Sequence, residues 1–209
     1  MFCAGILVLL VLVAIFAPVI APYDPTYQDY SAVLAEPSMA HPFGTDEYGR
    51  DILSRIIYGS RVSLSIGIVA QVVASLVGVT LGAVAGYYGG RIDSVISRIM
   101  EIFQAFPDLI FAMAIMTFLG KGVLNLFIAL GLLTWVRTAR MIRGSVMQLK
   151  EKEYIEASRA CGASTFWIIT KGLVPNCLST IIVLVTLGIP NAIMYEASLS
   201  FLGIGIQPP

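Results

Sequence analysis

The chain has 209 residues, of which 57% are hydrophobic and only 12% are charged, and its mean hydropathy is +0.86. These values exclude an ordinary soluble globular domain and predict a protein whose solvent is largely lipid. The 13 basic residues balance the 13 acidic ones, so the net charge gives no reason to expect a nucleic-acid partner.

Five apolar segments are long enough to cross a membrane as helices, because a span needs about 20 residues. They lie at roughly 2–21, 62–88, 95–119, 122–142 and 166–190. The first has no charged region before it and no good cleavage site, so we interpret it as a spanning helix rather than a removed signal peptide. We predict an all-α transmembrane helical bundle, with one helix and an outer loop at 1–61 and a transmembrane domain at 62–209.

The polar segment at 22–61 separates the first two predicted helices. Its acidic and basic residues alternate at short spacing, at Asp46, Arg50, Asp51 and Arg55. Such side chains can pair along a helix at the outer membrane surface, but they could equally serve substrate entry, and the sequence favours neither. His41 is the only histidine, which makes a poor metal site, so we interpret it as a loop residue.

Small residues recur at every fourth position of the second predicted helix, at Ala70, Ala74, Gly78, Gly82 and Gly86. They form one helical face that another helix can approach closely in lipid. The approaching helix could belong to the same chain or to a partner subunit. In either case, we expect a bulky residue at Gly82 to disrupt assembly.

The third predicted helix carries Glu101, Gln104 and Asp108 at spacings of three and four, and Pro107 interrupts its backbone hydrogen bonds. A charged group at bilayer depth costs roughly 2.5 to 3.5 kcal/mol on insertion scales, so it normally faces protein or water. Asp108 is therefore a candidate for a translocation path. In the alternative interpretation, Glu101 reaches the membrane surface and Asp108 pairs with a neighbouring helix.

The connection between the fourth and fifth predicted helices is rich in basic residues, which predicts a cytoplasmic location. They are Arg137, Arg140, Arg143, Lys150, Lys152, Arg159 and Lys171. Counting helices from this connection places the amino terminus inside and the acidic first loop outside. Small residues between Ala157 and Ala163 predict a helix, a glycine break and a second helix just outside the bilayer. This segment is either a solvated connection or a docking element for a protein partner. The cysteines Cys3, Cys161 and Cys177 lack metal-type spacing, and we interpret them as packing residues.

The same segment carries a recognisable motif. Glu156, Ala157 and Ser158, followed by Gly162 and then Pro175, resemble the EAA loop of the permease subunits of bacterial ABC importers. Two positions depart from that pattern: Gly172 stands where isoleucine is usual and Val174 where leucine is usual. The resemblance implies that this loop couples the permease to an ATP-binding subunit.

Two further segments narrow the family. The outer loop is similar to the signature of the C-type permeases of dipeptide, oligopeptide and nickel importers, at Gly44, Thr45, Asp46, Gly49, Arg50, Asp51, Ser54 and Arg55. Residues 196–203 and 207–209 are similar to the segment after the fifth helix in the same proteins. Those relatives carry a sixth helix, so we expect that a last helix is missing from this chain.

The resemblance implies a MetI-like, type I importer permease fold in the cytoplasmic membrane of a bacterium or archaeon. It implies three kinds of partner: a homologous permease subunit, two subunits that bind ATP and Mg²⁺, and an extracytoplasmic solute-binding protein. The cargo would be a peptide, nickel or a related small solute. The segment Gly120-Lys121-Gly122 lacks the spacing of a phosphate-binding loop, and no catalytic cluster is evident, so we expect no cofactor, metal or enzymatic activity in this chain. The alternative is a secondary transporter or channel subunit driven by an ion gradient.

Overall fold

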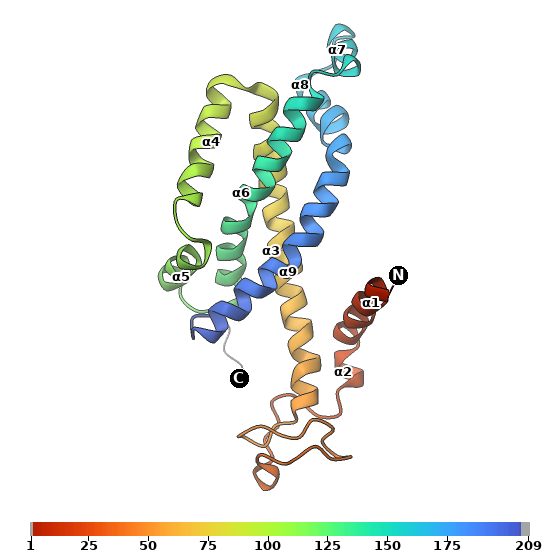
Figure 1. Cartoon of the computed structure of the whole chain (residues 1–209), viewed down its shortest axis with the longest axis vertical. Coiled ribbons are helices and arrows are strands. Elements are labelled where there is room, and N and C mark those ends of the chain that lie inside the picture. Colours follow the sequence, from red (N-terminus) through yellow and green to blue (C-terminus); the bar gives the residue numbers. More distant parts are fainter. Residues whose placement is uncertain (1, 206–209) are drawn as a thin grey trace. The chain divides into compact units, whose positions relative to one another are not determined.

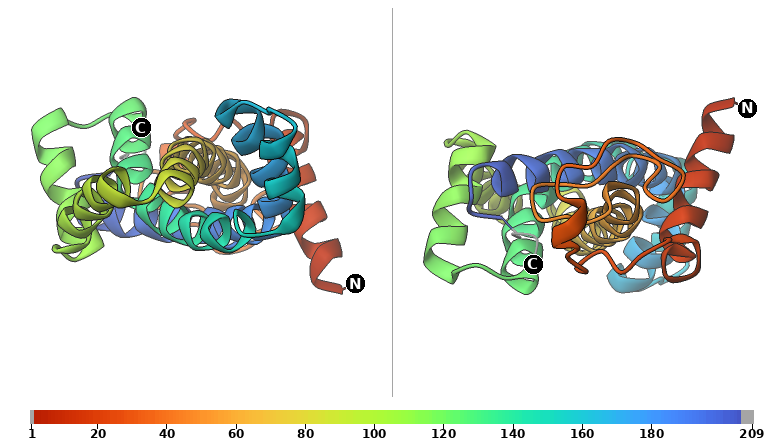
Figure 2. Two further views of the ribbon diagram at one scale, coloured as in Figure 1. Left: turned by 90° about the horizontal axis from the view of Figure 1, so that it is seen from above. Right: turned by 90° about the horizontal axis from the view of Figure 1, so that it is seen from below.

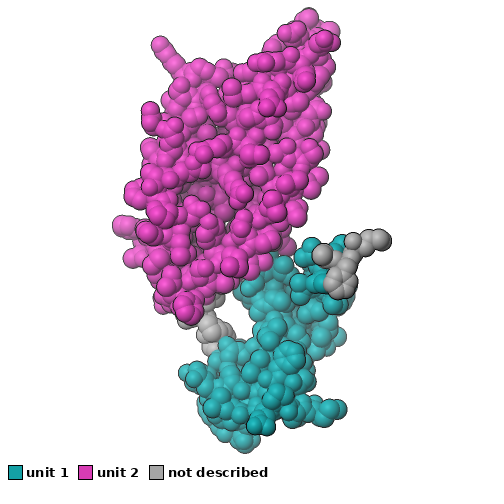
Figure 3. All heavy atoms as spheres, viewed as in Figure 1, with its two compact units in different colours: residues 1–65, 208–209 teal, residues 66–207 magenta. Residues whose placement is uncertain are grey.

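The computed structural model describes residues 2–205, which are folded into helices, with one isolated bridge between Thr45 and Asp51 as the only β pairing in that range. The all-α prediction is confirmed for this part of the chain. The chain forms two compact units with their boundary between Ser65 and Ile66 (Figure 3). Residues 207–209, which contribute to the resemblance, lie outside the described residues.

The first unit begins with α1 (Phe2–Ile15) and α2 (Ala17–Ile20), followed by an irregular loop that contains a 3-10 turn at Tyr30–Ala32. The single helix predicted at 2–21 is therefore wrong. The helix is interrupted at Phe16, and Pro18 occupies the first turn of α2. Proline is tolerated there because its missing N–H would have no partner in a first turn.

The long helix α3 (Ile52–Tyr88) starts ten residues before the predicted span. Gly89, whose φ is +65°, follows its last residue. Hydropathy detects only the apolar part of a helix, and the more polar first turns of α3 precede that part. Residues up to Ser65 belong to the first unit and the remainder to the second.

The second unit continues with α4 (Gly90–Gln104) and α5 (Asp108–Leu119), which are bent by 88° relative to one another. The continuous span predicted at 95–119 is therefore wrong. Pro107 has no N–H to donate, and it disfavours the helical conformation of Phe106 before it. The helix consequently ends and restarts in a new direction.

The remaining helices are α6 (Val123–Leu149), α7 (Glu153–Ala160), α8 (Thr165–Trp167) and α9 (Leu178–Phe201). A π-helix at Ile168–Leu173 and a 3-10 turn at Pro175–Cys177 connect α8 to α9. Figure 1 shows that α7 lies at the same end of this unit as the turn between α3 and α4, and Figure 2 shows α5 on the far side of the unit from α7.

Three helical stretches between residues 2 and 205 are long and apolar enough to cross a membrane, at Ile52–Tyr88, Val123–Leu149 and Thr165–Phe201. The bent pair α4 and α5 gives a fourth if it counts as one span, and the apolar helix Ala4–Ile15 is shorter. The predicted five continuous spans thus differ from the structure at the first and third.

The small residues of α3 lie against α6. A Cβ atom added at Gly82 would stand 2.5 Å from the carbonyl oxygen of Ala139, and one added at Gly78 would stand 2.7 Å from that of Trp135. Gly86 is equally close to Arg143. The backbones of α3 and α6 are therefore in close contact within one chain. This contact sets the relative position of the two helices.

Candidate functional site

A short projecting segment at one end of the second unit is the first candidate site. We call residues 153–167, which comprise α7, the turn at Gly162 and α8, the knob. Gly162 has φ of +81°, a conformation in which a side chain is strained, and Ser164 caps α8 by accepting the amide hydrogen of Trp167 at 3.3 Å. The helix, glycine break and second helix that the sequence predicts are thus present.

One buried side chain anchors the knob to the bundle. Ile155 is fully buried in an apolar cluster that includes Ile142 and Val146 of α6 and Ile168 of the π-helix. A Cβ atom added at Gly172 would lie 3.0 Å from Cδ1 of Ile155. The glycine that departs from the EAA pattern therefore leaves room for this anchor.

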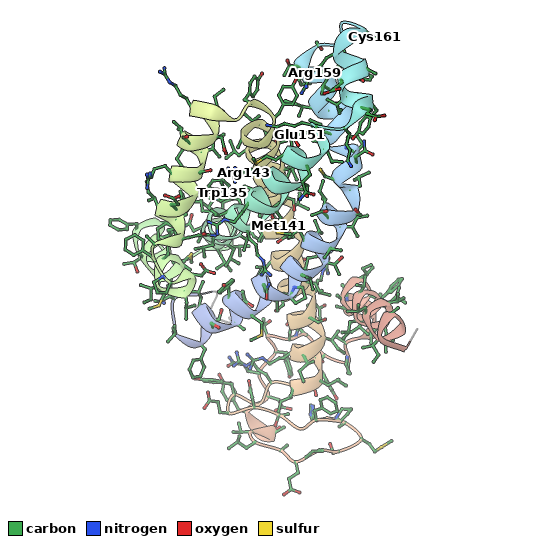
Figure 4. The ribbon with its side chains drawn as sticks, turned by 45° about the horizontal axis from the view of Figure 1, so that its top comes forward. Trp135, Met141, Arg143, Glu151, Arg159 and Cys161 are labelled. Atoms are coloured by element: carbon green, nitrogen blue, oxygen red, sulfur yellow. The ribbon has the colours of Figure 1, made fainter. Side chains whose placement is uncertain are left out.

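The opposite side of the knob is open to solvent. Glu156, Ala157 and Gly162 are exposed, and Ala157, Ser158, Gly162 and Trp167 line a shallow open groove. Cys161 is also exposed, so its interpretation as a packing residue is wrong, because it follows α7 on this projecting face (Figure 4). Cys177, by contrast, is buried.

Cations connect the knob end of the unit to neighbouring helices. The guanidinium of Arg159 lies 5.5 Å from the centre of the Tyr87 ring at the end of α3, a cation–π contact. Lys150 donates to the carbonyl oxygen of Gly86 at 3.0 Å. Arg143 forms a two-pronged ion pair with Asp93 of α4, with one N–O distance of 2.6 Å (Figure 4).

A polar pocket within the second unit is the second candidate site. It is lined by side chains of α3, α5, α6 and α9 and encloses about 80 Å³. Asp108 lies at the start of α5, and its carboxylate accepts a hydrogen bond from the hydroxyl of Tyr195 on α9 at 2.6 Å. The pocket is large enough for a handful of water molecules, and too small for a whole peptide.

The predicted face of Glu101, Gln104 and Asp108 does not exist, because the bend at Pro107 separates α4 from α5. Glu101 is exposed and pairs with Arg98 at 2.8 Å, and Gln104 accepts a hydrogen bond from Arg140. Asp108 alone reaches the pocket.

Several residues of the pocket were not singled out by sequence reasoning. Gln71 and Thr138 are polar and almost fully buried, at 2% and 3% exposed. Arg137 also lines the pocket, although the sequence groups it with the basic cytoplasmic connection. A signal was available: these residues are polar positions inside otherwise apolar helices.

The family signature in the outer loop forms a network centred on Asp46. Its Oδ1 accepts the amide hydrogens of Tyr48 at 2.9 Å and Arg50 at 3.0 Å, and its Oδ2 pairs with Arg50 at 2.8 Å and with Arg55. Burial disfavours the charged carboxylate, but the amides of Arg50 and Tyr48 and the Arg50 guanidinium outweigh it and lower the pKa of Asp46 from 3.8 to about 2.

A second carboxylate, Asp51, caps the start of α3. Oδ2 of Asp51 accepts two hydrogen bonds from Ser54, one from the amide at 2.8 Å and one from the hydroxyl at 2.7 Å. Oδ1 of Asp51 lies 3.0 Å from Nδ1 of His41. Burial opposes ionisation, but the Ser54 and His41 contacts outweigh it and lower the pKa of Asp51. His41 also stacks on Tyr23, with ring centres 4.9 Å apart.

The other signature residues shape the same loop. Thr45 donates to the carbonyl oxygen of Ala32 and accepts the amide hydrogen of Ala35 at 2.8 Å. Gly44 and Gly49 have φ of +74° and +72°, and added Cβ atoms there would collide with the backbone. The ion pairs are real, but the Asp46 to Asp51 stretch is a loop rather than the predicted surface helix. Because the contacts are internal, they favour a structural function.

Comparison with known proteins agrees with these features. Residues 78–209 match the family model described as binding-protein-dependent transport system inner membrane component, and residues 1–37 match that of the N-terminal TM domain of oligopeptide transport permease C. In fold, 69% of the chain superposes on 72% of a chain of the MetNI methionine ABC transporter in inward facing conformations, with a TM-score of 0.60 and 23% identity.

Curated relatives share far more sequence. The chain is 45% identical over 208 residues to the dipeptide transport system permease protein DppC of Bacillus subtilis, covering 99% of this chain and 65% of the relative. It is 42% identical over 204 residues to the oligopeptide permease OppC of the same organism, covering 98% and 67%. The glutathione transport system permease GsiD of Pectobacterium atrosepticum is 41% identical over 208 residues, covering 99% and 69%.

The chain thus spans about two thirds of the length of these relatives. The matches extend over both compact units, and they agree with the all-α fold. The chain therefore belongs to the family of binding-protein-dependent transport system inner membrane components, among the C-type permeases of dipeptide and oligopeptide transport systems.

Proposed function

We propose that this chain is a membrane-spanning permease subunit of an ABC importer for short peptides or related small solutes. In this proposal, separate subunits bind ATP and Mg²⁺ and hydrolyse the ATP, a homologous permease completes the path, and an extracytoplasmic binding protein delivers the solute. Family membership disfavours the alternative of a secondary transporter driven by an ion gradient.

The observation that carries the proposal is the construction of the knob. Its Ile155 side is buried against α6 and the π-helix, whereas Glu156, Ala157 and Gly162 face solvent. A segment that was only a connection would need no buried anchor. An anchored projection with an open groove suits a protein partner, and the EAA resemblance makes an ATP-binding subunit that partner.

The anchor also suggests how movement would pass into the bundle. Ile155 contacts the apolar cluster of α6 and of the π-helix that leads into α9. These two helices line the polar pocket together with α3 and α5. Closure of the ATP-binding subunits would then shift α6 and α9 as near-rigid bodies and change access to the path.

The proposed orientation has the knob in the cytoplasm. Arg91 lies in the first turn of α4, Arg143 lies toward the end of α6, Lys150 follows α6 and Arg159 lies on α7. Figure 1 shows that α7 and the turn between α3 and α4 lie at the same end of the second unit. An excess of Lys and Arg marks the cytoplasmic side of a membrane protein. By the count of predicted helices in the sequence, the Asp46 loop would lie outside.

The test is reconstitution of the full-length protein with its candidate partner subunits and binding protein in proteoliposomes. We expect solute-loaded binding protein to stimulate ATP hydrolysis and to drive uptake, and we expect Glu156→Ala to reduce the stimulation severalfold. Glu151→Ala is the matched control, since it removes the same charge from an exposed site just before α7. Uptake that follows an ion gradient and ignores ATP would contradict the proposal.

A further inference from the structure

An exposed arginine, Arg137, lines the polar pocket and forms no hydrogen bond or ion pair within the part of the chain that the structure describes. Arg137, Arg140 and Arg143 follow one another at intervals of three on α6. Arg140 donates to Gln104 and Arg143 pairs with Asp93. Arg137 makes no hydrogen bond or ion pair with any residue between 2 and 205.

The position of Arg137 makes this unusual. It lies near the middle of α6, one of the helices that can span a membrane. An arginine within a spanning helix normally faces a bundle interior or a water-filled path and marks a functional site. Arg137 faces the pocket.

The rest of the pocket supplies complementary chemistry. Asp108 carries the opposite charge on α5 and is held by the Tyr195 hydroxyl at 2.6 Å, yet it forms no ion pair with Arg137 within the described range. Gln71 and Asn191 add amide groups to the lining. One cavity therefore presents an unpaired cation and a separate anion among polar neutral groups, which matches the two ends of a zwitterion.

We propose that Arg137 receives the carboxylate of the transported solute as the solute passes through the membrane, so that this subunit itself selects solutes with a free carboxyl group. A guanidinium binds a carboxylate through two parallel hydrogen bonds, which gives orientation as well as strength. The enclosed 80 Å³ accommodates one end of a short peptide. The inference rests on the proposed importer function and adds a substrate class to it.

The experiment compares ATP-dependent uptake of an alanine dipeptide and of its carboxyl-terminal amide by the full transporter in proteoliposomes. Both solutes are supplied at concentrations that saturate the binding protein, so that its own preference does not enter the ratio. We expect wild type to transport the free dipeptide faster, on the order of tenfold, as the loss of one charged hydrogen-bonded contact predicts. Arg137→Gln should slow the dipeptide much more than the amide, so that the ratio of the two rates falls toward one.

Two further variants make the result specific. Arg137→Lys should keep part of the preference, because it retains the charge and loses the paired geometry. Arg140→Gln is the matched control, since it removes a cation one turn away that bonds Gln104, and it should keep the wild-type ratio.

Several results would overturn the inference. Wild type could transport both solutes equally, or Arg137→Gln could slow both by the same factor. The variant could also lose the partner permease on purification, which would assign Arg137 to assembly. A wild-type transporter with no ATP-dependent uptake of any solute that its binding protein carries is a different outcome, since it contradicts the importer function itself. Uptake of other solutes without uptake of the dipeptide would overturn this inference alone.

Discussion

At the scale of single residues, the carboxylate of Asp46 holds the outer loop together. It accepts two backbone amide hydrogens and pairs with Arg50 and Arg55. The pKa of Asp46 lies at about 2, below its ordinary value of 3.8. Since the folded loop favours the ionised form, this contribution to stability is complete above pH 3.8 and is lost as the pH falls toward 2.

Replacement of Asp46 by Asn should therefore loosen the loop at neutral pH. We expect amide hydrogen exchange at residues 46–50 to rise by about tenfold, which corresponds to a loss of about 1.4 kcal/mol. Asp24→Asn is the control, because Asp24 is exposed and its hydrogen bonds go to the adjacent Thr26. Equal exchange in Asp46→Asn and wild type would show that the network does not hold the loop.

The short sequence separation of the acidic and basic residues in this loop was sufficient to predict that they form ion pairs, because residues close in sequence are also close in space. It was not sufficient to predict the contact of His41 with Asp51, which depends on how the loop folds back. Arg137 was assigned to the cytoplasmic basic group, because composition does not reveal which way a side chain on a long helix faces.

At the scale of secondary structure, close contact between α3 and α6 determines the shape of the second unit. Helices associate in lipid when small residues let their backbones approach. Gly78, Gly82 and Gly86 provide that approach along α3. The sequence left open whether these glycines meet the same chain or a partner, and the contact observed is within the chain.

A larger side chain at Gly82 should separate these helices. Leucine there would meet the backbone of Ala139 rather than a movable side chain, so we expect Gly82→Leu to destabilise the protein by about 3 kcal/mol. Thermal unfolding in detergent measures this change. Gly144→Ala, on α6 with nothing within 4 Å of an added Cβ, should change stability by no more than about 1 kcal/mol; similar losses in both variants would refute the close contact.

The knob depends on its buried anchor in the same way. Ile155→Ala should cost about 3 kcal/mol of local stability, because it leaves a cavity against α6 and the π-helix. Faster hydrogen exchange at residues 153–160 would reveal this loss. Tyr154→Ala, at a neighbouring position that is 43% exposed, should leave exchange nearly unchanged, and equal effects would mean that Ile155 is no anchor.

The helical pattern of the chain was largely predictable, whereas helix directions were not. Proline marked the interruption at Pro107, but the 88° bend follows from the packing of α5 against α6 and α9. The π-helix before α9 has no sequence signal of its own. Its hydrogen bond from Val174 to the carbonyl oxygen of Ile169, at 2.9 Å, is visible only in the folded chain.

At the scale of the whole molecule, fold class was predictable because lipid leaves few alternatives to helices for an apolar chain. The polar pocket was less accessible to prediction, because it draws on four helices that are far apart in sequence. The knob and the pocket are linked through α6 and α9. In the proposed importer, energy input would act at one end of these helices and the solute would pass near their middle.

Co-purification of the full-length protein with its candidate ATP-binding subunits in detergent tests this account most directly. We predict that wild type retains these subunits and that Gly162→Asp loses them, because the variant adds a charge and a strained side chain to the exposed turn of the knob. Glu151→Ala should retain them. Absence of any ATP-binding subunit from the wild-type preparation, in a protein that still moves solute down an ion gradient, would contradict the central claim.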